Sequence, residues 1–147
     1  MRIGVPLEIR LGETRVAATP ETVKKLIGQG HSVVIQKSAG VRASQPDSAY
    51  EAVGATIGSA ADAFGAEIVL KVRAPEAAEL KQIQSGSVLI GMLDPFDNDN
   101  IAAMAAQGVT AFSLEAAPRT TRAQSMDVLS SQANIAGYKA VMVAANE

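Results

Sequence analysis

The 147-residue sequence contains no cysteine, which excludes disulfide bonds and metal sites built from thiolates. No apolar run reaches the roughly 20 residues that cross a bilayer, so we expect no membrane insertion by this chain. The formal net charge of −2 and an isoelectric point near 5.4 give no basic surface, and we expect no nucleic-acid partner. Residues 1–6 lack the long apolar stretch of a signal peptide. These absences favour a soluble domain without a metal site and are compatible with the cytosol.

Length and composition predict a single domain over residues 1–147. Hydrophobic residues make up 48% of the sequence and charged residues 19%, which suffices for one ordinary core. Short runs rich in Val, Ile and Leu alternate with helical patterns, and the predicted strands cover residues 2–6, 32–36, 67–72, 87–92 and 109–113. This alternation predicts a doubly wound α/β fold with a mainly parallel sheet, a three-layer sandwich of Rossmann-like or flavodoxin-like type.

Helix signals lie between the predicted strands. Thr19 is the expected N-cap of a helix over residues 20–29, because Pro20 suits the first helical position. Further helices are predicted over residues 75–84 and 98–107. The Ala-rich residues 45–64 are expected to form two short helices around a brief extended piece at residues 56–57.

The last predicted helix, residues 130–146, is unusual for its small side chains. Alanine or glycine stands at positions 133, 136, 137, 140 and 144, so another backbone could pack closely against one face. The simpler interpretation, which we favour, is an ordinary helix of the core. Neither a Gly cap nor a Pro stop follows this helix before Glu147, so we expect the sequence to be the N-terminal part of a longer protein.

Polar side chains gather just before this helix. Arg119, Gln124, Asp127 and Ser130 supply a cation, an amide, a carboxylate and a hydroxyl within a dozen residues. This mixture suits a polar ligand such as a carboxamide. The alternative is that Asp127 or Ser130 caps the helix while Arg119 is solvated surface. Capping and ligand contact are compatible with each other.

Several motifs resemble a known family over nearly the whole chain. They are MRIGVP at residues 1–6, GETRVA at 12–17 with Thr19-Pro20, LKV at 70–72 and the long run RAQSMDVLSSQANIAGYK at 122–139. The sequence resembles the N-terminal domain of the alpha subunit, or domain I, of proton-translocating nicotinamide nucleotide transhydrogenase. That domain belongs to a superfamily shared with alanine dehydrogenase. The long run is the most specific of these motifs.

The resemblance implies a role for each polar residue. Arg119, Asp127 and Ser130 would bind the carboxamide of the NAD(H) nicotinamide, and Gln124 would reach toward NADP(H) on a partner domain. Gln124 and Asp127 are then the catalytic candidates. Hydride passes directly between two nicotinamide rings, so the protein must hold the rings in a reactive orientation and needs no base.

The resemblance also implies cofactors and partners. Most of NAD(H) would be bound by a Rossmann domain that follows this chain, because the sequence lacks a G-x-G-x-x-G turn; residues 28–33 come nearest but lie at a helix end. We therefore expect the isolated chain to be inactive. The expected partners are the NADP(H)-binding and membrane components, with a homodimer in the full protein. The expected place is the cytoplasm, at the inner face of the cytoplasmic membrane.

Arg15 and Lys71 are candidates for a substrate pocket. In alanine dehydrogenases the matching Arg and Lys hold pyruvate, but plain ion pairing explains both residues equally well. The alanine dehydrogenase alternative lacks a His on the loop after the fourth main strand, where this sequence has Leu-Asp-Pro-Phe at residues 93–96. The single histidine, His31, lies at a turn and is interpreted as structural. A non-catalytic interaction module is the third possibility.

Overall fold

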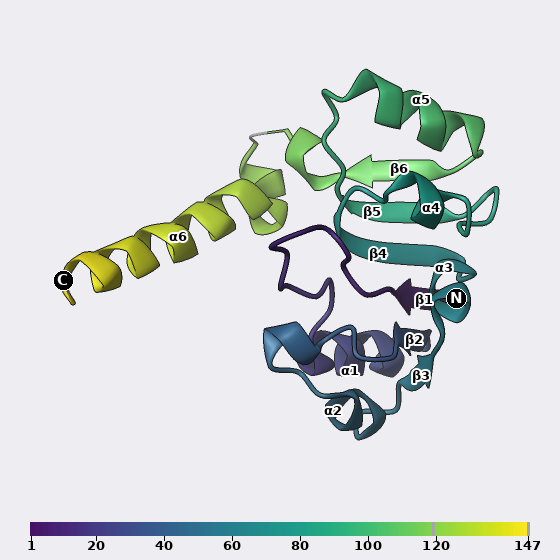
Figure 1. The fold of residues 1–147 in the computed structure, drawn as a ribbon, viewed down its shortest axis with the longest axis horizontal. Helices are drawn as coiled ribbons and strands as arrows, with labels where there is room; N and C mark the ends of the chain where they lie inside the picture. Colours follow the sequence, from purple (N-terminus) through teal and green to yellow (C-terminus); the bar gives the residue numbers. More distant parts are fainter. Residues whose placement is uncertain (119, 147) are drawn as a thin grey trace.

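A single parallel sheet organises the molecule, as seen in the computed structural model, which describes residues 1–118 and 120–146 (Figure 1). Its strands are β1 (Arg2–Val5), β2 (Ser32–Gln36), β3 (Thr56–Gly58), β4 (Ile68–Arg73), β5 (Val88–Met92) and β6 (Thr110–Ser113). They lie in the order β3-β2-β1-β4-β5-β6, and each adjacent pair is parallel. This is the Rossmann order, so the doubly wound α/β prediction is confirmed. The extended piece predicted at residues 56–57 is a paired edge strand.

The helices are α1 (Pro20–Gly28), α2 (Asp47–Glu51), α3 (Ala60–Phe64), α4 (Ala77–Leu80), α5 (Asn98–Ala106) and α6 (Val128–Ala144), with 3-10 turns η1 (Val41–Ala43), η2 (Leu114–Ala116) and η3 (Thr121–Met126). Thr19 caps α1 through Thr22, as predicted. Helix α4 is shorter than the predicted 75–84. Glu76 occupies its N-cap, and Gln82 and Ile83 continue it only as turns to carbonyls three residues back.

Helices cover both faces of the sheet. Ile3 and Val5 of β1 pack in one core cluster with Val23 of α1 and Tyr50 of α2. Gly4 lies between them and faces the backbone of α3 instead. Successive side chains of a strand point to opposite faces of the sheet. Helices α1 and α2 therefore cover one face, and α3 covers the other. A second cluster includes Val69 of β4 and Leu89 of β5 and packs on that half of the sheet.

Gly4→Ala should destabilise the fold by about 1–3 kcal/mol. A Cβ at this position would lie 1.8 Å from the carbonyl oxygen of Ala63, and this backbone atom cannot move aside as a side chain could. Gly28→Ala is the matched control, because its Cβ would meet nothing within 4 Å. Urea unfolding of both variants measures the effect. Equal midpoints for the two would contradict the close contact between β1 and α3.

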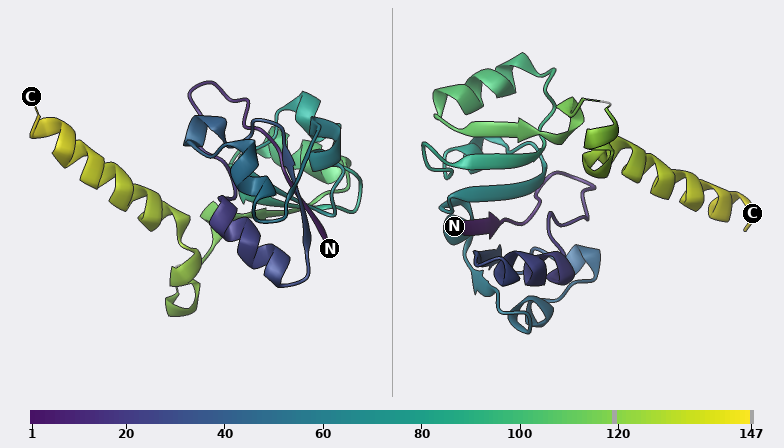
Figure 2. Two further views of the ribbon diagram at one scale, coloured as in Figure 1. Left: turned by 90° about the horizontal axis from the view of Figure 1, so that it is seen from below. Right: turned by 180° about the vertical axis from the view of Figure 1, so that it is seen from behind.

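Helix α6 extends away from the sheet, as Figures 1 and 2 show. None of its described residues is buried, and Ile135, Tyr138 and Val141 are 59%, 72% and 69% exposed. The prediction of an ordinary core helix is therefore wrong for this chain. The small apolar residues indicate that α6 can be covered, but they do not specify by what, and here α6 contacts η2 at its base. No helix in residues 1–118 and 120–146 is both long and apolar enough to span a membrane.

Candidate functional site

A pocket of about 670 Å³ lies beyond the carboxyl ends of β5 and β6, at the base of α6. It is lined by residues after β5 (Asp94, Pro95 and Phe96), around η2 (Leu114, Glu115, Ala117 and Pro118) and from η3 into α6 (Thr120, Ala123, Gln124, Asp127, Leu129 and Ser130). In open parallel sheets, ligands bind outside the carboxyl ends of the strands. The volume lies within the usual range for small-molecule sites, about 300–1,000 Å³.

Three of the four polar residues singled out by the sequence line this pocket together: Gln124, Asp127 and Ser130. The fourth, Arg119, lies outside the described residues. Gln124 is exposed, so its amide is accessible from outside the pocket. Arg15 and Lys71 are not among the lining residues, and they belong to a separate network.

Asp127 is the N-cap of α6. Its Oδ1 accepts a hydrogen bond from the backbone N–H of Ser130 at 3.0 Å, and its Oδ2 accepts from the Ser130 hydroxyl at 2.6 Å. The capping alternative is therefore observed. It does not exclude a ligand, because two carboxylate oxygens offer about four acceptor positions and the hydroxyl keeps its own lone pairs. The cap fixes both side chains relative to the helix.

Glu115 is a pocket residue that sequence reasoning missed. Its Oε2 accepts hydrogen bonds from the backbone of Leu93 at 2.8 Å and from the Ser113 hydroxyl at 2.5 Å. Its Oε1 accepts from the backbone of Asp94 at 3.2 Å, and Asp94 has a left-handed φ of 52°. Glu115 thus ties the loop after β5 to the end of β6. A carboxylate two residues after a predicted strand was the available signal.

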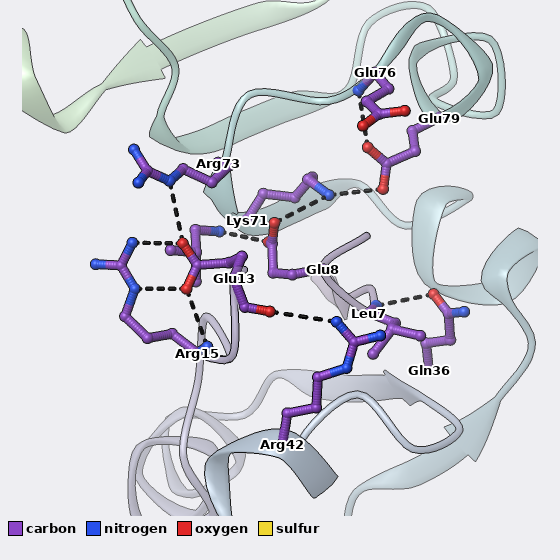
Figure 3. A network of polar contacts seen from close by, with 11 residues as sticks. Leu7, Glu8, Glu13, Arg15, Gln36, Arg42, Lys71, Arg73, Glu76 and Glu79 are labelled. Atoms are coloured by element: carbon purple, nitrogen blue, oxygen red, sulfur yellow. Dashed lines mark hydrogen bonds and ion pairs between the residues drawn. The ribbon is translucent and has the colours of Figure 1, made fainter. Parts of the chain in front are cut away.

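A second polar network lies beyond the carboxyl end of β1, beside the neighbouring strand β4, and Glu13 is its hub (Figure 3). Arg15 donates to both Glu13 oxygens, from Nε at 2.7 Å and from Nη2 at 2.6 Å. Arg73 Nε donates to Oε2 at 3.1 Å, and Arg42 donates to the Glu13 carbonyl at 3.4 Å. The hydrogen bonds from Arg15 lower the pKa of Glu13 to about 2.

Lys71 is buried beside this hub, between two carboxylates. Its Nζ lies 2.7 Å from Glu79 Oε1 and 3.4 Å from Glu8 Oε2. Figure 3 draws both contacts as dashed lines. Glu8 Oε1 also accepts from the backbone N–H of Val72 at 2.7 Å. Burial raises the pKa of Glu8 although Lys71 and the hydrogen bonds lower it. Arg15 and Lys71 are therefore ion-paired, and a substrate role for either stays a prediction.

Residues 4–136 match the family model described as the alanine dehydrogenase/PNT N-terminal domain. The chain belongs to this family. An NAD(P) transhydrogenase alpha-subunit protein of Rhodospirillum rubrum is 46% identical over 155 residues, covering 100% of this chain and 40% of that protein. The crystal structure of transhydrogenase from Sinorhizobium meliloti superposes with a TM-score of 0.96 at 49% identity, covering 100% of this chain and 45% of that one.

The alanine dehydrogenase relatives are less similar to this chain than the transhydrogenase relatives are. Alanine dehydrogenase 1 of Staphylococcus aureus is 33% identical over 146 residues, covering 99% of this chain and 38% of that protein. The chain is thus more similar to transhydrogenase alpha subunits, as residues 122–139 predict. It spans less than half the length of each relative named here.

Glu13 should make the stability of this domain pH-dependent in acid. Its folded-state pKa of about 2 lies below the ordinary value of 4.5, so its stabilising effect is full above pH 4.5 and is lost as the pH falls toward 2. Arg15 is partly exposed, so we expect a contribution of only about 2 kcal/mol.

Unfolding of Glu13→Gln and wild type between pH 2 and 7 measures this contribution. The two stability curves should converge near pH 2 and separate as the pH rises through 4.5. Glu21→Gln is the control, because Glu21 pairs with Lys25 on the open surface and its loss should change little. A constant difference between Glu13→Gln and wild type at all pH values would contradict the assignment.

Proposed function

We propose that this chain is the N-terminal domain of the NAD(H)-binding alpha subunit of a proton-translocating NAD(P) transhydrogenase. In this proposal the pocket holds the nicotinamide of NAD(H) for direct hydride transfer to or from NADP(H). The observation that carries it is the convergence of Gln124, Asp127 and Ser130 on one pocket, in a chain whose close relatives are named as transhydrogenase alpha subunits.

The chemistry of the pocket suits a carboxamide. The carboxamide NH₂ would donate to Asp127 and to the lone pairs of the Ser130 hydroxyl, and its carbonyl would accept from the guanidinium of Arg119. Such contacts fix the plane of the ring to which the carboxamide is attached. Hydride transfer requires this orientation, with the reacting atoms about 3–3.5 Å apart. In this role the residues orient the ring and exchange no proton with it.

The rest of the assembly follows from the same proposal. A Rossmann domain after this chain would bind most of NAD(H), and a partner domain would bring NADP(H). Relatives named as transhydrogenase subunits support a complex of several components. We propose that the full protein is a homodimer that works with membrane components at the cytoplasmic face of the membrane.

An amino-acid dehydrogenase is the second candidate, supported by the relative from Staphylococcus aureus. The complete protein distinguishes the candidates in two assays. Hydride transfer from NADH to an NADP analogue, without alanine-dependent reduction of NAD, is the expected result. The opposite pattern would favour the alanine dehydrogenase type, and neither activity would favour an interaction module.

Gln124→Asn should slow hydride transfer roughly 10-fold in the complete assembly. The change keeps the amide but shortens its reach by one methylene toward a nucleotide on the partner domain. NADH affinity and stability should remain nearly unchanged, since Gln124 is exposed. Gln29→Asn is the matched control, because Gln29 is exposed at the end of α1. Single-turnover kinetics with NADH titration decide. An unchanged rate, or a loss explained by weaker NADH binding, would remove Gln124 from the site.

A further inference from the structure

A hydrogen bond connects helix α6 to the loop after β1. Arg15 Nη1 donates to Gln132 Oε1 at 2.8 Å, joining residues 117 positions apart in the sequence. Gln132 lies in the second turn of α6, two residues after Ser130 and five after Asp127. The contact therefore reaches the helix close to the end that lines the pocket.

The Arg15 side of this contact is held firmly. Two guanidinium nitrogens, Nε and Nη2, are bound by the two oxygens of Glu13, and the backbone N–H of Arg15 donates to Glu13 Oε1 at 3.0 Å. This bidentate geometry fixes the plane of the guanidinium and directs Nη1 outward. Arg73 and Arg42 hold Glu13 in turn. Arg15 thus extends from an anchored group at the switch point of the sheet.

The Gln132 side determines what the contact can control. Asp127 and Ser130 belong to the cap and first turn of α6, and their mutual hydrogen bonds make them move with the helix. The rest of α6 is exposed and extends away from the sheet (Figures 1 and 2). A tilt of α6 about its base would therefore shift both side chains within the pocket. A misplacement of about 1 Å can cost a reaction as much as 100-fold in rate.

We propose that Arg15 and Gln132 are positioning residues, which lock the first turns of α6 against the Glu13 hub and thereby set the orientation of Asp127 and Ser130. The kinetic consequence rests on the proposed function, whereas the effect on helix orientation does not. Arg15 acts here through the helix and need not touch a substrate.

The kinetic test uses the complete protein. Gln132→Leu removes the acceptor at similar size, and the single-turnover hydride-transfer rate should fall roughly 10-fold while NADH affinity and unfolding midpoint stay nearly constant. Gln132→Glu keeps an oxygen acceptor and should restore the rate. Asn134→Leu is the control, because two residues further on it lies on nearly the opposite side of the helix. A wild-type rate in Gln132→Leu, or no rescue by Gln132→Glu, would overturn the proposal.

A double variant tests whether the two residues act together. Arg15→Met combined with Gln132→Leu should be no slower than Arg15→Met alone, because each change breaks the same contact. Losses that multiply would show that Arg15 and Gln132 act independently and would overturn the pairing.

Helix orientation provides a readout that does not depend on activity. Spin labels on Lys24→Cys in α1 and Lys139→Cys in α6 report the distance between these two helices. Any cysteines outside residues 1–147 are first replaced, since residues 1–147 contain none. Gln132→Leu should broaden the distance distribution. If wild type transfers no hydride, the proposed function fails, but a broadened distribution still supports the positioning role. An unchanged distribution overturns it.

Discussion

Replacement of Asp127 by alanine should lower the rate of hydride transfer in the complete protein roughly 10-fold to 1000-fold. In the proposed site, the Asp127 carboxylate orients the carboxamide of the nicotinamide. This interaction contributes most in the transition state, when the ring must be aligned for hydride transfer. A separate domain would supply most of the NADH binding energy. The loss should therefore fall on the rate more than on NADH affinity. Arg119→Ala should have the same signature.

The N-cap at Asp127 requires its own control. Alanine also removes the hydrogen bond to the backbone of Ser130, which should cost about 1 kcal/mol of stability. Asp127→Asn keeps a good N-cap but loses the charge, and a charge-assisted hydrogen bond is about twice as strong as a neutral one. We expect Asp127→Asn to fold like wild type and still transfer hydride slowly.

Stopped-flow single-turnover rates and NADH titrations measure both variants. If Asp127→Asn were as fast as wild type while Asp127→Ala were slow, the residue would serve only as a cap. Wild-type rates in Asp127→Ala would contradict the ligand role entirely.

The sequence predicted the sheet well because its signals are local. Strands such as β2 and β5 are short apolar runs bounded by polar residues or glycine. The dipeptide Thr19-Pro20 is sufficient to predict the start of α1. The pocket residues Gln124, Asp127 and Ser130 were also predictable, since they lie within seven positions of one another and on one turn and helix start. Neighbours in sequence need no tertiary information to be brought together.

Long-range partners could not be predicted in this way. Glu8 pairs with Lys71, and Glu13 pairs with Arg73, only because β1 and β4 are adjacent in the sheet. No local sequence pattern predicts this strand order. Glu115 depends likewise on the pairing of β5 with β6. The apolar residues of α6 indicate that the helix can be covered, but the composition does not say by which surface.

Lys71→Met should destabilise the protein by about 3–5 kcal/mol, because it leaves two buried carboxylates without their cation. The side chains of Lys71, Glu8 and Glu79 are 1%, 2% and 5% exposed, so water cannot replace the lost charge. Lys25→Met removes the same cation from an exposed pair with Glu21 and is the matched control. It should change stability far less than Lys71→Met does, because both partners are solvated.

The pH dependence identifies the cause of the loss. Without Lys71, the folded-state pKa of Glu8, which burial already raises, should rise further. When the folded-state pKa of a carboxyl is raised, its contribution to stability is fully present at a pH below its unfolded-state pKa. That contribution is lost as the pH rises through the folded-state pKa. Lys71→Met should therefore be closer to wild type at pH 5 than at pH 8.

Neutralising the carboxylates should reverse part of the damage. Adding Glu8→Gln and Glu79→Gln to Lys71→Met removes the uncompensated charges, and replacing a whole buried ion cluster costs much less than breaking it. Chemical unfolding at pH 5 and pH 8 compares Lys71→Met, the triple variant and the Lys25→Met control with wild type. A loss in Lys71→Met that is the same at both pH values and is not relieved in the triple variant would mean that Lys71 does not act by neutralising Glu8 and Glu79. Its contribution would then come from another contact, for example the Nζ that lies 5.8 Å from the centroid of the Phe64 ring.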